Sequence, residues 1–235
     1  YGSFPSQIRE IASLKVATVV ERNTPAAQQT SSADQEQTSS DTSAKDDAVT
    51  DEVYTIFVSG IDTRGGMTAS SRSDVNIILT LNATTKQILM VSTPRDYFVP
   101  LSISNGVPDK LTHAGIYGVN VCMDTLDMLY DIDINYYFRL NFAGFEQIID
   151  ALGGVTVNSD YDFTSGEYHF NQGENHLNGE QALVFARERY AFQEGDRQRG
   201  RDQMAVIQGV VDKATQPAFL KNYLSVLDSL DGAFE

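Results

Sequence analysis

Residues 74–92 decide the fold, and they read Asp-Val-Asn-Ile-Ile-Leu-Thr-Leu-Asn-Ala-Thr-Thr-Lys-Gln-Ile-Leu-Met-Val-Ser. Two apolar runs, 74–81 and 87–92, are separated by a short polar turn at 82–86. This pattern predicts two strands joined as an antiparallel hairpin. A third apolar run at 53–60 ends in a glycine and predicts a buried strand of the same sheet.

The rest of the chain alternates helical and strand patterns. Apolar residues at helical spacing predict helices over 120–130, 142–152 and 197–214. The pair Gly153-Gly154 ends the second of these helices, and a further strand is expected at 155–157. Strands interleaved with helices around an internal hairpin indicate an α/β fold, a three-layer α-β-α domain with a mixed central sheet.

The first 50 residues differ in composition from the remainder. Residues 8–20 are amphipathic and fit either a helix or a strand, whereas residues 24–50 contain no Leu, Ile, Phe or Tyr. Such a segment buries too little apolar surface to offset its conformational entropy, which indicates an exposed linker or loop. We therefore divide the chain into a first part at 1–50 and a main domain at 51–235.

Composition excludes several classes of protein. The 235 residues contain 17 Lys and Arg against 32 Asp and Glu, a net charge of −15, which argues against a nucleic-acid partner. Cys122 is the only cysteine, so neither a disulfide framework nor a cysteine-based zinc site is expected. No apolar run approaches the roughly 20 residues that span a bilayer, so any membrane anchor is expected to lie outside this chain.

Arginines stand beside acids or amides in four clusters of this acidic chain. The planar guanidinium fits phosphate oxygens two at a time, and interspersed carboxylates offer oxygen ligands to a divalent metal. Together they predict a phosphate-ester or pyrophosphate site that favours Mg²⁺ over Zn²⁺. The clusters contain Asp62 and Arg64; Arg72 and Asp74; Arg95 and Asp96; and Arg187, Arg189, Asp196, Arg199 and Gln203.

Each cluster also has a plainer interpretation, and for Arg95 it is a structural pair with Asp96. Asp62 follows a strand and a glycine, so it is either a metal ligand at a strand end or a turn residue. Arg72 and Asp74 point to one side of an extended segment, as site residues or as a surface ion pair of little energetic value. Arg199 and Gln203 share one face of a helix that Asp196 is expected to cap, a face that either binds anions or is merely solvated.

Seven motifs occur in order over residues 53–212, at 57–64, 71–74, 92–96, 109–114, 149–155, 177–183 and 187–203. Together they resemble the LytR–CpsA–Psr family of Gram-positive cell-wall proteins. The resemblance is strongest to capsule-linked members, which carry an accessory region before the catalytic domain, and it implies that residues 1–50 are part of such an accessory region.

The resemblance implies a membrane-anchored, extracytoplasmic phosphotransferase. Such a protein moves a capsular or other cell-wall glycopolymer, with one phosphate, from an undecaprenyl (polyprenyl) pyrophosphate carrier to peptidoglycan. Asp62 and Asp74 would hold Mg²⁺, with Arg72 and Arg95 in catalytic and phosphate-binding roles. The phosphates would also be bound by Arg187, Arg189, Arg199 and Gln203. The family's domain usually continues beyond residue 235, so part of the fold is expected to be absent.

Three points stay open at this level. Asp96 and Asp196 are both candidates for a general base. A non-catalytic polyprenyl-phosphate-binding module, or a pyrophosphate hydrolase with water as acceptor, would use the same residue types. The sequence specifies neither the glycan, nor the acceptor sugar, nor the oligomeric state.

Overall fold

The computed structural model describes residues 15–18, 53–62 and 71–216 of the chain. Its helices are α1 (Leu111–Tyr117), α2 (Val119–Tyr130), α3 (Phe142–Ala151), α4 (Gly179–Arg187) and α5 (Asp196–Ala214). Its strands are β1 (Lys15–Thr18), β2 (Val53–Ile61), β3 (Ser73–Asn82), β4 (Gln87–Ser92), β5 (Phe98–Pro100), β6 (Pro108–Lys110), β7 (Tyr136–Leu140), β8 (Val155–Ser159), β9 (Phe163–Ser165), β10 (Tyr168–Phe170) and β11 (Gly173–Leu177).

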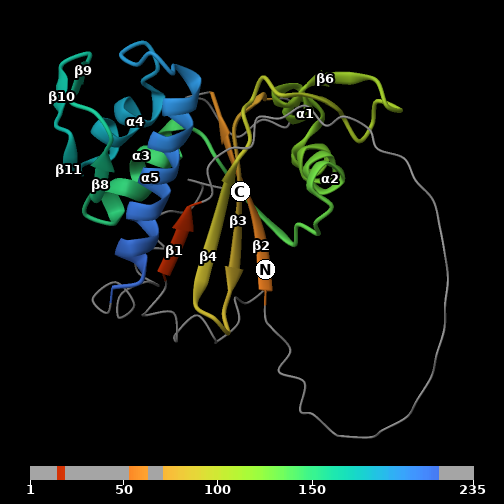
Figure 1. Ribbon diagram of the computed structural model, residues 1–235, viewed down its shortest axis with the longest axis horizontal. Helices are drawn as coiled ribbons and strands as arrows, with labels where there is room; N and C mark the ends of the chain where they lie inside the picture. The colour runs from red at the N-terminus through yellow and green to blue at the C-terminus, as the bar shows by residue number, and fades with distance from the viewer. Residues whose placement is uncertain (1–14, 19–52, 63–70, 217–235) are drawn as a thin grey trace, which may run out of the picture.

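A five-stranded sheet forms the centre of the molecule, in the order β1-β4-β3-β2-β7 (Figure 1). β3 pairs antiparallel with both β4 and β2, whereas β7 runs parallel to β2 and β1 runs parallel to β4. The hairpin predicted from residues 74–92 and the mixed character of the sheet are confirmed.

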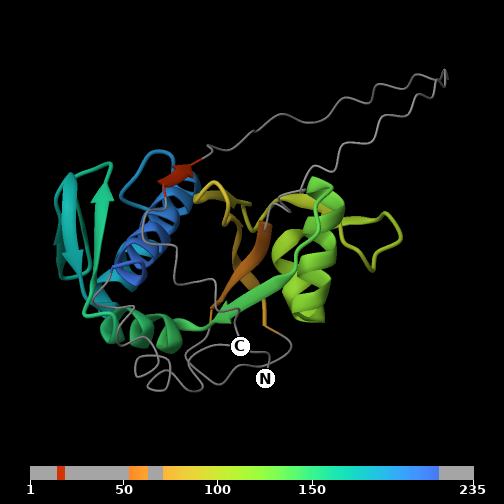
Figure 2. The same ribbon diagram turned by 90° about the horizontal axis from the view of Figure 1, so that it is seen from below.

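Helices cover both faces of this sheet, which confirms the three-layer arrangement (Figures 1 and 2). Side chains alternate along β2, so that Phe57 packs with Leu111 of α1 and Leu126 of α2. Val58, the next residue, packs on the opposite side with Met204 of α5. The helices predicted at 120–130, 142–152 and 197–214 correspond to α2, α3 and α5.

A side unit extends the layer that contains α3, α4 and α5. β8 pairs with β11 and β9 with β10, both antiparallel. Phe163, Phe170 and Phe185 stack within its core, with ring centroids 4.9–5.7 Å apart. Contacts of this kind add to the gain from burying the rings. The unit therefore gives α4 and α5 a rigid support.

The strand β1 lies within the part of the chain that the sequence set apart as an accessory region. Residues 15–18 pair with Gln87–Met90 of β4, so this short segment contributes an edge strand to the central sheet. The other residues of the 1–50 region, including the proposed linker, lie outside the described residues. The boundary at residue 51 stays a prediction.

One acidic side chain is enclosed by the fold. Asp202 of α5 is 2% exposed, and its Oδ1 accepts a hydrogen bond from Gln198 Nε2 at 2.9 Å. Among the described residues, no donor reaches its second oxygen, Oδ2. Burial raises the pKa of Asp202 to about 7, because water no longer stabilises the charged form.

This shift makes the stability of the protein depend on pH. Between about pH 4 and 7 the folded state holds a proton on Asp202 that the unfolded chain has released, so stability falls as pH rises through this range. Asp202→Asn keeps the side chain neutral and should remove this loss. We expect the variant to be more stable than the parent by a wider margin at pH 8 than at pH 5, and the two margins should differ by at most ~3 kcal/mol at about 1.4 kcal/mol per pH unit.

Urea unfolding at the two pH values measures this difference. Asp160→Asn is the control, because Asp160 contacts the same Gln198 amide but its side chain is 52% exposed. A parent and an Asp202→Asn variant with parallel pH profiles would show that Asp202 ionises normally.

Candidate functional site

A cavity of about 570 Å³ lies between the sheet and the helices α3, α4 and α5. It collects side chains from β2, β3, the segment after β4, α4 and α5, which are far apart in the sequence. Seven of the ten predicted site residues line it: Asp62, Asp74, Arg95, Arg187, Arg189, Arg199 and Gln203. The expected convergence of these residues on one cavity is therefore observed, while the role of each stays a prediction.

Asp74 owes its position to an irregularity in the sheet. Gly60 pairs with Val75 but Ile61 pairs with Ser73, so the register skips Asp74 and leaves it as the bulged residue. A bulge re-aims the side chain that it carries. Here Asp74 joins Asp62 in lining the cavity, as a shared metal site requires.

Helix α1 and the segment after β4 hold this carboxylate. Asp74 Oδ1 accepts a hydrogen bond from Thr112 Oγ1, and Asp74 Oδ2 one from Arg95 Nη1, both at 3.0 Å. Gly115 lets α1 approach the start of β3, since a Cβ there would lie 2.4 Å from the backbone nitrogen of Ser73. Neither Thr112 nor Gly115 stands in a sequence pattern that predicts these roles.

Arg187 and Asp62 face each other at the rim of the cavity. Their nearest side-chain atoms, Arg187 Nη2 and Asp62 Oδ1, are 3.9 Å apart, and both side chains are about half exposed. The guanidinium of Arg187 also lies over the ring of Phe142, with its carbon 4.3 Å from the ring centroid. The aromatic face steadies the cation without neutralising it, so its charge stays available to an anion.

Glu188 shapes the loop that carries Arg189. Its Oε1 accepts hydrogen bonds from the backbone N–H groups of Arg189, Tyr190 and Ala191 at 2.6–3.0 Å, and its Oε2 accepts one from Ser165 Oγ. Burial acts to raise the pKa of Glu188, but these bonds outweigh it and the pKa is lowered. The position of Glu188 between two arginines was the only sequence signal for this role.

Arg199 is the most enclosed of the four arginines that line the cavity, with 14% of its side chain exposed. Burial lowers the pKa of Arg199, and repulsion from Arg95 and Arg189 adds to the effect. Asp196 opposes this shift, because both of its oxygens lie 2.8–2.9 Å from Arg199 Nη2. Gln203, one turn further along α5, donates through Nε2 to the carbonyl of Ala186 at 3.2 Å.

The expectation that Asp196 caps α5 is wrong. Gly195 occupies the N-cap position with φ 52°, and no side chain makes a capping hydrogen bond there. Asp196 is the first residue of the helix itself. The carboxylate of Asp196 pairs with Arg199 instead. The charge-assisted bond to Arg199 Nη2 thus takes the place of a bond to a backbone N–H group.

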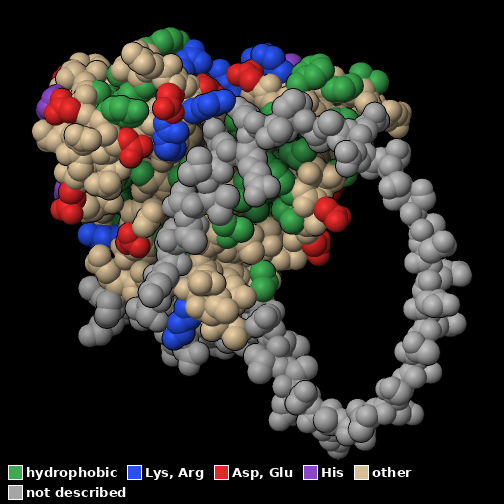
Figure 3. All heavy atoms as spheres, in the orientation of Figure 1, with side chains coloured by type: hydrophobic (Ala, Val, Ile, Leu, Met, Phe, Trp, Pro, Cys, Tyr) green, Lys and Arg blue, Asp and Glu red, His purple; other side chains and the backbone are tan. Residues whose placement is uncertain are grey.

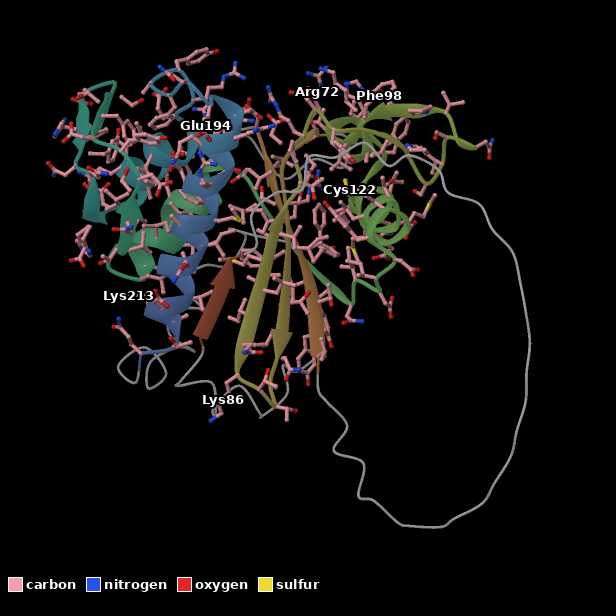
Figure 4. The ribbon with its side chains drawn as sticks, viewed as in Figure 1. Arg72, Lys86, Phe98, Cys122, Glu194 and Lys213 are labelled. Atoms are coloured by element: carbon pink, nitrogen blue, oxygen red, sulfur yellow. The ribbon has the colours of Figure 1, made fainter. Side chains whose placement is uncertain are left out.

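The other three predicted residues lie beside the cavity. Asp96 and Asp196 line an adjoining hollow of about 300 Å³ that shares Asp74, Arg95, Arg199 and Gln203 with the main cavity. Arg72 is exposed just before β3, at the same end of the sheet, but is not among the residues that line either hollow (Figure 4). Arg64 lies outside the described residues.

Asp96 is held by cations. Its Oδ1 accepts from Lys110 Nζ at 2.7 Å, and its Oδ2 lies 3.6 Å from Arg95 Nε. The bond from Lys110 lowers the pKa of Asp96, and the charges of Lys110, Arg95 and Arg199 act in the same direction. Asp96 is therefore a weak base.

Apolar side chains line the inner part of the main cavity. They come from β2, β3, β7, α3, α4 and α5, namely Val58, Val75, Leu140, Phe145, Leu183 and Ile207. Helix α2, by contrast, contributes no residue to the lining of this cavity. α2 packs on the opposite face of the sheet, where Cys122 and Leu126 are buried.

Asp62 and Asp74 supply some, but not all, of the ligands that a Mg²⁺ site needs. Both line one cavity and both offer hard carboxylate oxygens. Within 15–18, 53–62 and 71–216 no group of three or more His, Cys, Asp or Glu side chains is placed to hold a metal. Two carboxylates fit Mg²⁺ only if phosphates and water supply the remaining ligands, as is common for this ion.

Comparisons with known proteins identify relatives of this chain. The model of the LytR_cpsA_psr family matches residues 16–235. The polyisoprenyl-teichoic acid–peptidoglycan teichoic acid transferase TagU of Enterococcus faecalis is 36% identical over 76% of this chain and 59% of its own length. The Bacillus cereus protein of the same name is 37% identical over 76% and 58%. The chain thus spans about three-fifths of the length of these relatives.

Solved structures share the fold. The crystal structure of B. subtilis TagU has a TM-score of 0.65 and 30% identity, and the match covers 78% of this chain and 76% of that one. The structure of TagT bound to LI-WTA has a TM-score of 0.62 and 29% identity, and the match covers 82% of this chain and 71% of that one.

In the described part of this chain, no helix is long and apolar enough to cross a membrane.

The geometry predicts that Glu188 orders the arginine loop. Glu188→Ala leaves three backbone N–H groups without their acceptor, so amide hydrogen exchange at residues 189–191 should accelerate by about tenfold or more, as expected when local opening becomes easier by ~1.4 kcal/mol. Ser165→Ala is the control, because it removes only the bond to Oε2 and should change these rates far less. Equal exchange rates in parent and Glu188→Ala would contradict the assigned role.

Proposed function

The chain belongs to the LytR–CpsA–Psr family, and from this premise we propose that it transfers a phosphate-linked cell-wall or capsular glycopolymer from a polyprenyl pyrophosphate carrier to peptidoglycan. The proposed place of action is the extracytoplasmic face of the cell membrane. A membrane anchor outside this chain would hold the protein there. The relatives named teichoic acid transferases support the reaction class, and the choice of glycopolymer is left open.

A single observation carries the proposal: one cavity combines four arginines with a long apolar wall. A polyprenyl pyrophosphate has the matching halves, a dianionic or more highly charged head and a hydrocarbon tail. Arginine binds phosphate oxygens through paired donors. The volume, about 570 Å³, lies within the usual range of small-molecule sites, roughly 300–1,000 Å³.

Arg95 offers further support for a bound anion. Its Nε is buried and has no hydrogen-bond partner among the described residues, and the nearest carboxylate oxygen, Asp96 Oδ2, is 3.6 Å away. A buried donor without an acceptor is costly, by about 1–3 kcal/mol. A phosphate oxygen in the cavity would satisfy this donor.

In the proposed reaction a hydroxyl of peptidoglycan attacks the phosphorus that bears the glycan. A new P–O bond forms to peptidoglycan, the bond to the bridging oxygen breaks, and prenyl phosphate leaves with the bridging oxygen while the hydroxyl proton goes to solvent or a base. Arg95, Arg189 and Arg199 stabilise the charge that develops on the phosphoryl group and the leaving phosphate. Arg187 at the rim and Gln203 complete the phosphate contacts. Arg72, which is exposed beside the cavity, is proposed to contact the phosphate on the side that bears the glycan.

Asp62 and Asp74 are proposed to hold Mg²⁺ when the substrate is bound. When present, the ion neutralises phosphate charge and polarises phosphoryl oxygens. In the structure Asp62 faces Arg187, and Asp74 accepts hydrogen bonds from Arg95 and Thr112, so a bound ion would compete with these partners for the two carboxylates.

Asp96 and Asp196 are the two candidates for a base, and each is paired with a cation in the structure. Asp96 has a lowered pKa and is held by Lys110, so it accepts a proton poorly. Both acids line the adjoining hollow, across the wall formed by Arg95, Arg199 and Gln203. An acceptor sugar in this hollow would lie next to Arg95 and Arg199, which line both hollows.

Two rival functions use the same site and are separated by product analysis. A purely binding module leaves lipid-linked glycan intact. A hydrolase releases a phosphorylated glycan into solution, whereas a transferase attaches the phosphate to peptidoglycan. Incubation of the protein with lipid-linked glycan, with and without peptidoglycan, tests the proposal, which requires wall-bound phosphate that depends on the acceptor.

Arg199→Ala should lower the rate of this transfer by about tenfold or more, because one charge-assisted hydrogen bond contributes about 1.5–3 kcal/mol. The melting temperature should change little, since burial and the neighbouring arginines already disfavour the charge of Arg199. Arg201→Ala is the matched control, two residues along the same helix but lining a different cavity. If the Arg199→Ala variant kept full activity, Arg199 would not be a phosphate-binding residue and this helix face would be merely solvated.

Asp62→Ala should abolish the stimulation of activity by Mg²⁺, because the remaining carboxylate, Asp74, is shared with Arg95 and Thr112. Titration of Mg²⁺ against activity measures the effect, and Mn²⁺ binding followed by electron paramagnetic resonance gives an independent readout. Asp160→Ala, an exposed acid outside the cavity, is the control. If Asp62→Ala keeps the full response to Mg²⁺, then Asp62 is not an essential ligand.

A further inference from the structure

A hairpin formed by β5 and β6 projects from the end of the molecule that carries the candidate site (Figures 1 and 2). Residues 98–108 of this hairpin contain no charged side chain. Three large apolar side chains are nevertheless exposed on it: Phe98 by 65%, Ile103 by 50% and Val107 by 66%. Apolar side chains so exposed on an uncharged projection are a surface that requires an explanation.

The exposure is a property of a well-packed segment. Val99 and Leu101, which alternate with the exposed residues, are 4% and 3% exposed and belong to the core that includes α2. The backbone N–H of Ser102 donates to Thr125 Oγ1 of α2 at 3.0 Å. The turn itself is closed by the backbone bond from Val107 N–H to Ser104 O at 3.1 Å. The fold thus holds Ile103 and Val107 outward.

The hairpin is coupled directly to the site. Phe98 pairs with Lys110 across the hairpin, and Lys110 Nζ donates to Asp96 at 2.7 Å. Asp96 follows Arg95, which lines the main cavity. Phe98 and Arg72 lie at the same end of the sheet in Figure 4, and Figure 3 shows hydrophobic and basic side chains together at this end. A second exposed ring, Tyr190, lines the cavity and is 84% exposed.

We propose that the tip of the β5–β6 hairpin inserts into the surface of the lipid bilayer and sets the mouth of the arginine cavity against it. This inference rests on the proposed function, in which the substrate is held in the membrane by its prenyl chain. A cavity that opens toward the bilayer lets the chain pass from lipid to protein without crossing water. Tyr190, with an apolar ring and a polar hydroxyl, suits the interfacial layer beside the tip.

A bilayer fits this surface better than a protein partner does. Phe, Ile and Val without charges enter the boundary between headgroups and acyl chains favourably. A stable protein interface buries about 800 Å² per partner, and the tip of a two-stranded hairpin is narrow for that purpose. Since the tip carries no charge, binding should depend on apolar insertion and should persist at high salt, unlike electrostatic adsorption.

The chain contains no tryptophan, so a single one can report on the tip. In Val107→Trp, fluorescence should shift to the blue on addition of phosphatidylcholine vesicles and should be quenched by brominated lipid. Val53→Trp is the matched control: Val53 is 43% exposed but pairs with Asn82, at the opposite end of the sheet. Its emission should not respond. A Val107→Trp spectrum that vesicles leave unchanged would overturn the proposal.

A second pair of measurements separates this inference from the proposed function. The double variant Phe98→Ser, Val107→Ser should partition into vesicles at least about tenfold more weakly than the parent, whereas Val53→Ser should partition equally. On a water-soluble short-chain prenyl pyrophosphate substrate the double variant should keep the parent's rate, and on vesicle-held substrate it should lose at least about tenfold.

The outcomes are distinct. If the parent inserts into vesicles but transfers no glycan from either substrate, the proposed function fails and the membrane surface stands. If the parent is active and both variants use vesicle-held substrate at the parent's rate, the membrane surface fails and the proposed function stands. A blue-shifted Val107→Trp spectrum that depends on protein concentration and not on lipid would assign the tip to self-association and overturn the proposal.

Discussion

Repulsion between arginines is the constraint on which the candidate site is built. Arg95, Arg189 and Arg199 lie close enough for each to affect the charge of another, and Arg199 is largely buried. Such a group is stable without ligand only if carboxylates offset it. Asp74 pairs with Arg95 and Asp196 with Arg199, at 2.8–3.0 Å. Arg189 lies 3.8 Å from the same Asp196, and Arg187 rests on an aromatic ring. Asp74 and Asp196 thus offset the arginine charge in the absence of ligand. In the proposed reaction, Asp74 would bind the metal and Asp196 is a candidate to accept a proton when the phosphates are bound.

The fold supplies these pairings by joining regular elements with one local irregularity. The bulge between β2 and β3 re-aims Asp74, and α1 approaches close enough to hold it. α5 divides its side chains between two environments: Arg199 and Gln203 line the cavity, whereas Gln198 and Asp202 are buried. Because one helix carries both sets, packing on its far side fixes the arginine on its near side. The β5–β6 hairpin extends the same rigid framework through Lys110 and Asp96 to the proposed membrane surface.

The sequence predicted those parts of the structure that local pattern determines. The hairpin of residues 74–92 and the helices at 142–152 and 197–214 follow from spacing alone, and the gathering of Arg199 with Gln203 follows from their separation of four. The bulge at Asp74 depends on the register between two strands, which no single segment specifies. The position of Asp196 before an apolar stripe predicts a helix cap, but the guanidinium of Arg199 competes for its carboxylate. The face of the sheet that α2 covers could not be predicted, because an apolar stripe does not reveal which face a helix packs on. Glu188 acts through backbone N–H groups, which leave no signature in the sequence.

The central claim is that one cavity holds both halves of a polyprenyl pyrophosphate. The most direct measurement is a crystal structure with a prenyl pyrophosphate of intermediate length and Mg²⁺. We expect the diphosphate between Arg95, Arg189 and Arg199, with the first isoprene units along Val58, Phe145 and Leu183. A diphosphate bound away from these arginines, or a prenyl chain left in solvent while the apolar wall collapses, would contradict the claim.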